Sequence, residues 1–369
     1  MREERNRRKE SVTYAEAALL DYIDALPAAP SGDVLVAGNR SGRIAIRLAE
    51  KFPSIRVTAH VFDAHHAGAI ARRIGECPEN IRSAVTTAVE PHIPAKNYSA
   101  AFFMDVPRST SAELALDQLE DVYCSLAPQA KAVLAFEGDH DAALKLLKKA
   151  APSVHVLERQ KHCSVFSFTK TAEIKRRDFS SYWEASVPGG PKMRFVSYPG
   201  CFCHRRADQG GLALAETASR IVPPDADILD MGCGSGMVGI LVADAQRRSN
   251  PGTCRKILFA DSHARAIEAA RENAKAAELE GCSKFLLSSN GLPPEKCGHF
   301  GAFLGNPPYF SDWRIAELFI ETAYKALRAG GVCLTVAKTP DGLEKIQAKY
   351  FRTVERIPRR GYTVLKSVR

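Results

Sequence analysis

The sequence predicts an α/β protein built from two tandem domains, each with a mostly parallel sheet that ends in an antiparallel hairpin. Three observations lead there. The chain has 369 residues, which suits two domains better than one. Apolar strands alternate with helical segments along most of the chain, a pattern typical of a parallel sheet with helices on both faces. The same order of segments occurs twice, which indicates a duplicated domain.

The second half is the clearer copy. Its first strand, DILDM, runs into the glycine turn GCGSG at 232–236, and MVGILVADAQRR continues with helical periodicity. The segment 263–278 is rich in Ala, Glu and Arg and predicts a strong helix. The last two strands alternate apolar and polar residues, as an antiparallel pair does. The predicted strands of this half lie within 227–236, 256–262, 284–290, 301–310, 330–338, 351–357 and 362–368.

The first half repeats this order less clearly. A strand and turn, DVLVAGNRSG, open the half, and later strands end in Asp63 and Asp105. The segment 154–170 predicts another terminal pair. We therefore expect a first domain over 1–170, a linker over 171–194 that contains Pro-Gly-Gly-Pro, and a second domain over 195–369. Chance similarity of two unrelated α/β domains is the alternative.

Composition and charge restrict the possible partners. The formal net charge is +9 and the pI about 9.0, which suits a polyanion such as nucleic acid but also fits a merely solvated basic surface. Basic residues gather at 351–369 and at 175–177. No apolar run is long enough to span a membrane, and the charged start is unlike a secretory signal. Ten scattered cysteines favour free thiols and a cytoplasmic location, with no metal site at Cys201-Phe-Cys203-His204.

The glycine turn DMGCGSG indicates a cofactor that contains a nucleoside. Gly232, Gly234 and Gly236 let the backbone approach a ligand, because no Cβ stands in the way. At the tip of the next strand, Asp261 and the adjoining Ser262 are placed to bind ribose hydroxyls. The stretch also matches the dinucleotide pattern G-x-G-x-x-G, so NAD is an alternative. Asp230 favours S-adenosylmethionine (SAM), since a carboxylate repels a pyrophosphate but pairs with an ammonium group.

The second motif, NPPY, follows the fourth strand of the second copy. Two prolines fix an extended strand end, and Asn306 stands at the carboxyl edge where open α/β sheets bind ligands. The Asn306 amide oxygen and the Pro307 carbonyl can both accept hydrogen bonds from one NH₂ group and orient it towards the SAM methyl. Pro308 stiffens the turn, and Tyr309 offers a ring on which an unstacked base can lie. A proline turn that merely ends a strand is the alternative.

Together these motifs resemble the SAM-dependent amino-group methyltransferases. The stretch FVSYPGCFCHRRADQGGLALAE at 195–216 and the ending RRGYTVLKSVR are similar to the ribosomal RNA guanine-N2 methyltransferases, small-subunit type C and large-subunit type G. The resemblance is good over about 195–369 and architectural only over 30–170. It implies two Rossmann-like methyltransferase domains in tandem, with a degenerate N-terminal copy that binds no SAM and serves RNA docking or support.

The resemblance also implies roles for three further residues. Asp208 and Gly210 would border the SAM site, and Asn290 would contact the adenine ring. The sequence departs from the family pattern in three places: NPP-Tyr-Phe stands where NPP-Phe-His is usual, Lys338-Thr339 where Asn and Arg are usual, and Gly301 where an aspartate is usual. The target nucleotide is therefore open.

Three functions remain open from sequence. The first is methylation of guanine N2 in ribosomal RNA or a ribosomal subunit, by a monomer that is a pseudo-dimer of domains. The second keeps the chemistry but acts on adenine N6 or on a protein glutamine. The third is a non-catalytic RNA-binding or ribosome assembly factor, against which the intact glycine turn and NPPY of the second half argue.

Overall fold

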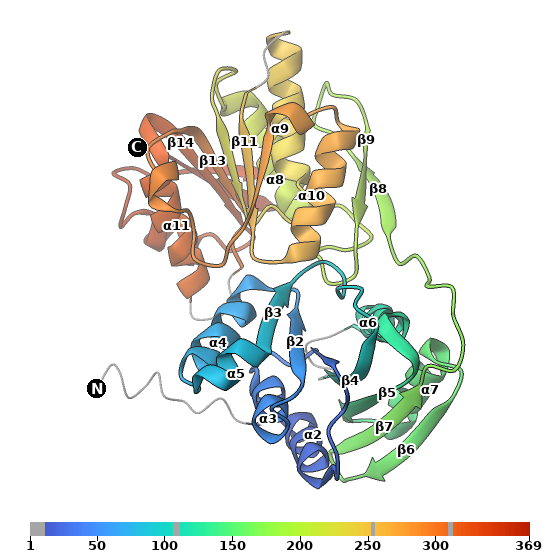
Figure 1. Ribbon diagram of the computed structural model, residues 1–369. Coiled ribbons are helices and arrows are strands. Elements are labelled where there is room, and N and C mark those ends of the chain that lie inside the picture. The colour runs from blue at the N-terminus through green and yellow to red at the C-terminus, as the bar shows by residue number, and fades with distance from the viewer. Residues whose placement is uncertain (1–11, 106–110, 252–254, 309–312) are drawn as a thin grey trace. The chain divides into compact units, whose positions relative to one another are not determined.

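The computed structural model describes residues 12–105, 111–251, 255–308 and 313–369. The chain divides into two compact units, Met1–Phe179 and Ser180–Arg369. Each is an α/β unit with a seven-stranded sheet (Figure 1). Within the described residues, no helix is long and apolar enough to cross a membrane.

The described part of the first unit runs from a helix through alternating strands and helices to a terminal hairpin. Its elements are α2 (Tyr14–Ala25), β1 (Asp33–Ala37), α3 (Arg43–Lys51), β2 (Arg56–Val61), α4 (Ala64–Gly75), α5 (Glu79–Ala84), β3 (Val85–Val89), β4 (Tyr98–Asp105), α6 (Ala112–Ser125), β5 (Leu126–Glu137), α7 (His140–Ala150), β6 (Val154–Arg159) and β7 (Cys163–Thr169).

The second unit repeats this order after a small two-stranded sheet. Its elements are β8 (Ser181–Ala185), β9 (Met193–Ser197), α8 (Gln209–Ile221), β10 (Ile228–Met231), α9 (Met237–Ser249), β11 (Ile257–Asp261), α10 (Ala264–Ala276), η1 (Glu280–Cys282), β12 (Ser283–Leu287), η2 (Pro294–Lys296), β13 (Phe300–Gly305), α11 (Arg314–Ala326), β14 (Leu327–Ala337), α12 (Asp341–Gln347), β15 (Glu355–Arg359) and β16 (Tyr362–Val368).

The two large sheets have the same topology, which confirms the predicted duplication. The strand order is β3-β2-β1-β4-β5-β7-β6 in the first and β12-β11-β10-β13-β14-β16-β15 in the second. Five strands of each sheet are parallel, and the last two form the antiparallel hairpin. The fold class was therefore predictable from the order of apolar segments alone.

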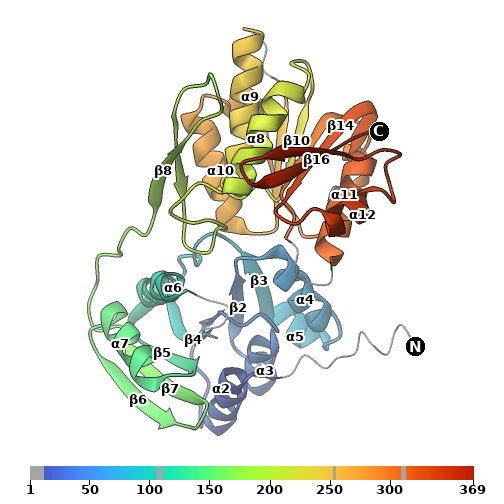
Figure 2. The same cartoon turned by 180° about the vertical axis from the view of Figure 1, so that it is seen from behind.

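Helices cover both faces of each sheet, as Figures 1 and 2 show. In the second unit α8, α9 and α10 share one core with Ala302 and Leu304, whereas α11 and α12 share the other with Phe303. Successive residues of a strand point to opposite faces, so β13 needs apolar residues at every position and all six of its residues are buried. In the first unit α2, α3 and α5 lie over one face, and α6 and α7 over the other.

Several features differ from the sequence prediction. β3 was not predicted, because its Val-Thr-Thr-Ala-Val sequence is only partly buried at the sheet edge. The segment 171–194, predicted as a linker, contains β8, which pairs with β9. The prediction of free thiols is wrong at Cys282, which is disulfide-bonded. The free cysteines among the described residues are Cys77, Cys124, Cys163, Cys201, Cys203, Cys233, Cys297 and Cys333.

Candidate active site

The glycine turn of the second unit links β10 to α9 through three residues in the left-handed region. The φ angles of Gly232, Gly234 and Gly236 are +68°, +54° and +79°. A Cβ on Gly232 would lie 2.7 Å from Phe319 Cζ, so this glycine is needed for packing. Around Gly234 no described atom lies within 4 Å of an added Cβ. That side of the turn is where a ligand could approach the backbone.

Asp261 ties the tip of β11 to this turn. Its Oδ2 accepts a hydrogen bond from the Gly234 amide at 2.9 Å, and its Oδ1 accepts one from the His263 amide at 2.9 Å. The carboxylate therefore lies beside the open glycine, with Ser262 next in the chain. Carboxylate oxygens have spare lone pairs, so Asp261 can still accept hydrogen bonds from a ribose.

Asp230 lies beneath the turn rather than on its open side. Its side chain is buried, and Oδ2 accepts a hydrogen bond from the Gly239 amide at 2.9 Å. Burial raises the pKa of Asp230 to about 7, the Gly239 amide opposes that rise, and the charge of Asp261 adds to it. A Cβ on Gly239 would meet both Phe259 and Asp230, so the last glycine of G-x-G-x-x-G serves helix–sheet packing here.

Asn306 is held by Asp208, although 98 residues separate them in the sequence. Asn306 Nδ2 donates a hydrogen bond to Asp208 Oδ2 at 2.6 Å. The same carboxylate caps α8, since it accepts from the Gly210 amide at 3.2 Å and the Gly211 amide at 2.7 Å. A carboxylate can only accept, so the Asn306 amide nitrogen faces Asp208 and its oxygen remains for another partner. Pro307, the next residue, is buried.

Tyr362 is a site residue that the sequence did not reveal. It begins β16, and the register that pairs Ala337 with Thr363 brings it to the carboxyl end of β14. A Cβ on Gly210 would lie 3.2 Å from the Tyr362 ring and 3.4 Å from Asn306 Nδ2. Gly210 is therefore the residue that lets α8, Asn306 and Tyr362 meet. The position of Tyr362 follows from the antiparallel register of β16 against β14, which the sequence does not show.

Two predicted site residues are not joined to this group by a contact that the structure describes. Asn290 is exposed after β12 and lines a cavity of about 210 Å³ with residues of α11, such as Leu318 and Thr322. None of the glycine-turn residues lines that cavity. Tyr309 lies outside the described residues.

The basic clusters noted in the sequence are partly neutralised within the chain. Arg176 and Arg177 bind acidic residues of α6 that are themselves buried. These two arginines therefore serve stability first. Further ion pairs are Arg356 with Asp341 and Glu344, Arg360 with Glu216, and Lys366 with Glu355.

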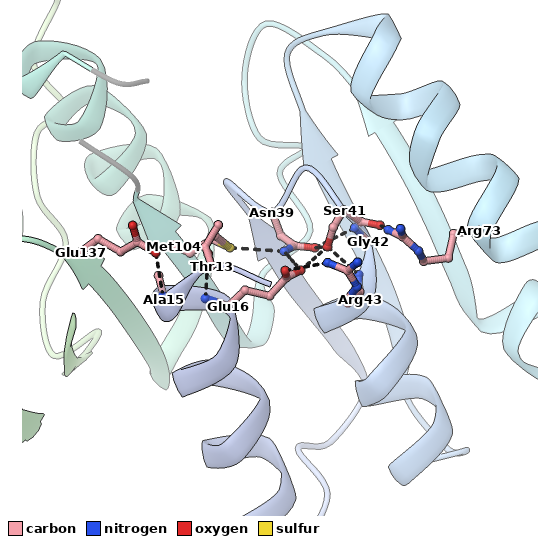
Figure 3. A network of polar contacts seen from close by, with 10 residues as sticks. All are labelled: Thr13, Ala15, Glu16, Asn39, Ser41, Gly42, Arg43, Arg73, Met104 and Glu137. Carbon is pink, nitrogen blue, oxygen red and sulfur yellow. Dashed lines mark hydrogen bonds and ion pairs between the residues drawn. The ribbon is translucent and has the colours of Figure 1, made fainter. Parts of the chain in front are cut away.

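The corresponding turn of the first unit is filled by its own side chains (Figure 3). Glu16 is buried on α2 and accepts a hydrogen bond from Asn39 Nδ2 at 3.0 Å and another from the Ser41 hydroxyl. Its second oxygen pairs with Arg43 at 2.9 Å. Asn39 Oδ1 in turn accepts from the Gly42 amide at 2.8 Å. The middle of this turn is thus tied to α2.

The second unit, with its glycine turn and its strand-end asparagine, has a match among known protein families. Residues 192–366 match the family model described as Methyltransferase small domain. The second unit is therefore similar to methyltransferase small domains over most of its length. Among the described residues, no three His, Cys, Asp or Glu side chains form a group that could hold a metal ion.

Two curated relatives carry the same name. The "Ribosomal RNA small subunit methyltransferase C" of Shewanella amazonensis is 28% identical over 220 residues, which are 58% of this chain and 60% of that protein. The protein of the same name from Pseudoalteromonas translucida is 25% identical over 302 residues, 79% of this chain and 81% of the relative. The first match thus spans less than two thirds of the relative's length.

A solved structure shares the whole two-unit fold. The 16S rRNA N2 methyltransferase of T. thermophilus, in complex with AdoMet and guanosine, gives a TM-score of 0.73 at 16% identity. The match covers 95% of this chain and 92% of that one. At this identity it supports the fold, with both units, and no single residue's role.

Proposed function

We propose that the second unit is a SAM-dependent methyltransferase that acts on an exocyclic amino group of a base in ribosomal RNA, with guanine N2 as the acceptor. The observation that carries the proposal is the orientation of Asn306 by Asp208 at the end of β13. The names of the curated relatives support ribosomal RNA as substrate. The similar solved structure, an rRNA N2 methyltransferase in complex with guanosine, supports guanine N2.

The residues present fit SAM as the methyl donor. Gly234 leaves open space for a ligand beside the Asp261 carboxylate, which can accept hydrogen bonds from ribose hydroxyls. Asp230, predicted from the sequence to pair with the ammonium of SAM, is buried beneath the turn and bonded to the Gly239 amide, so it would support the turn from below. When bound, SAM would supply a methyl group on a sulfonium, a leaving group that needs no acid.

Asn306 and Pro307 would orient the acceptor. The free Asn306 Oδ1 and the Pro307 carbonyl accept one hydrogen bond each from the NH₂ group, which favours a pyramidal nitrogen whose lone pair faces the methyl. The N–C bond forms as the C–S bond breaks, and the electron pair of that bond stays on sulfur. The resulting ammonium group loses its proton to water. Tyr309 and Tyr362 are candidates for the rings that hold the base.

The first unit would bind no SAM and would serve RNA docking or support of the second unit. The network around Glu16 supports this, because the turn segment that would approach a cofactor is bonded to α2 instead.

The test uses purified protein, labelled SAM and undermodified ribosomal RNA, 30S and 50S subunits. Digested RNA is resolved by nucleoside mass spectrometry, with Asn306→Ala as the control. The proposal predicts N2-methylguanosine with wild type and none with the variant. N6-methyladenosine would keep the mechanism and change the target, whereas SAM binding without transfer to any RNA would point to a protein acceptor. Failure to bind SAM would refute the proposal that the second unit is a SAM-dependent enzyme.

A further inference from the structure

The loop from Tyr198 to Asp208 holds an aromatic ring out to solvent. Among the large apolar side chains that the structure describes, Phe202 is the most exposed, at 71%. Its neighbour Cys201 is buried, so the loop has an inner and an outer side. A single exposed ring on a mobile loop is common and needs no explanation. A ring held outward by a fixed loop indicates a binding surface.

Side chains of α10 and β9 fix the loop. Arg265, which is itself buried, donates a hydrogen bond to the Pro199 carbonyl at 3.0 Å. Ser197 Oγ lies 3.0 Å from His204 Nδ1. Tyr198 donates to Glu272 of α10 at 2.6 Å. The outward ring is therefore part of an anchored loop.

The backbone of the loop adopts conformations that its residues disfavour. Cys203 and Arg205 have φ angles of +53° and +74°, in the left-handed region that residues other than glycine rarely adopt. Such strain persists where surrounding contacts enforce it, and it often accompanies a functional surface. Here the strained turn keeps Phe202 outside while Cys201 points inside.

The loop lies at the rim of the proposed acceptor site. It leads directly into Asp208, whose carboxylate holds Asn306. Burial first, and the Asp208 charge next, raise the pKa of Cys203 in this loop. Phe202 is thus separated from the group that orients the acceptor by a single short, anchored loop.

Positive charge accompanies the ring. Arg205 and Arg206 are exposed, and Arg206 forms no ion pair within the part of the chain that the structure describes. In the basic clusters at 175–177 and 351–369, by contrast, Arg176, Arg177, Arg356 and Arg360 are paired with acids. An exposed ring next to an unneutralised arginine suits a base together with its phosphate.

We propose that Phe202 is a stacking platform for an unpaired RNA base next to the target nucleotide, with Arg206 at the adjoining phosphate. The proposal rests on the proposed function, since it takes the acceptor to be RNA. Stacking on Phe202 would hold the flanking strand while the target base enters the site at Asn306. This predicts a preference for single-stranded or locally opened RNA.

The test compares Phe202→Leu with Phe202→Tyr in the full chain. Leucine keeps an apolar side chain but removes the ring, and tyrosine keeps the ring. Dissociation constants are measured for SAM and for an RNA that the wild type methylates, together with the thermal midpoint. Tyr14→Leu, which alters another exposed ring on α2 of the first unit, serves as the matched control.

The platform predicts that Phe202→Leu weakens RNA binding by about 5- to 150-fold, the range that loss of one base–aromatic stack gives. SAM affinity and thermal midpoint should stay unchanged, and Phe202→Tyr should bind RNA like wild type. RNA binding by Phe202→Leu equal to that of wild type would overturn the stacking platform, and so would an equal loss in Phe202→Leu and Phe202→Tyr. Neither outcome would affect the proposed function. If wild type binds and methylates no RNA, the proposed function falls as well.

Discussion

The two turns that follow β1 and β10 occupy the same place in the same topology and differ in what fills them. In the second unit Gly234 leaves space at the backbone, and the third residue after the helix cap Asp208 is Gly211. In the first unit the third residue after the cap Thr13 is Glu16, and its carboxylate binds Asn39, Ser41 and Arg43 (Figure 3).

Packing of the core therefore determines the sheet, whereas the requirements of ligand binding determine the turn. The cores of both units keep helices on both faces, because burial of the strands stabilises the fold whatever the turn does. The turn contributes to ligand binding only if its polar backbone stays available. In the first unit, an acidic residue on the neighbouring helix binds side chains of the turn instead.

The largest effect is expected from Gly234→Ala. The left-handed φ costs alanine about 1–2 kcal/mol, and the added methyl projects into the space where SAM would lie. We predict that calorimetry detects no SAM binding while the unit stays folded. The matched control is Gly138→Ala in the first unit, which also has a positive φ (+89°) and no described atom within 4 Å. It should lose similar stability and keep full SAM affinity; if it loses SAM binding too, the assignment of the site to the second unit is wrong.

The next effect concerns Asp208 as the residue that positions Asn306. Serine caps helices nearly as well as aspartate but is too short to keep the Asn306 contact, whereas asparagine can keep both. We predict that Asp208→Ser lowers kcat by about 10- to 100-fold, because misplacement of an orienting group by an ångström has effects of this order. The dissociation constant for RNA and the thermal midpoint should change little, and Asp208→Asn should recover most of the rate. Equal rates for the serine variant and wild type would refute the positioning role.

The order of strands and the position of the motifs were predictable, but the contacts that assemble the site were not. Apolar runs such as 301–305 mark buried parallel strands whatever their partners. The Asn306–Asp208 bond depends on how α8 packs against the sheet, which no local pattern encodes. Tyr362 reaches the site only through the register of β16. The paired arginines at 176 and 177 were misleading for the same reason, since charge in the sequence does not reveal the acid that neutralises it.

In the first unit we expect Glu16→Ala to reduce stability without altering SAM binding. The substitution removes the carboxylate that accepts from buried Asn39 and pairs with the partly buried Arg43, and removing one partner of a buried ion pair costs about 3–5 kcal/mol. Because Arg43 is partly exposed, the lower end of that range is expected. Urea denaturation would measure the loss. If Glu16→Ala gained a second SAM site, Glu16 would be the residue that keeps SAM from the first turn.

A smaller effect should appear in the pH dependence of the SAM-free protein. The pKa of Asp230 is raised to about 7 in the folded state, above its value near 4 when unfolded, so the folded state holds this proton more tightly. The contribution is fully favourable below pH 4 and is lost as the pH rises to about 7. Asp230→Asn should therefore gain stability relative to wild type over this range, on the order of a few kcal/mol, in paired urea titrations. A difference that does not vary with pH would contradict the buried, proton-holding state of Asp230.

The most direct test of the contrast between the two turns is the number of SAM molecules that one chain binds. Isothermal titration of the full wild-type chain with SAM gives this number without any variant or RNA. We expect one site per chain, at the turn that contains Gly234. Two sites would contradict it, because the turn tied to Glu16 would then bind SAM as well.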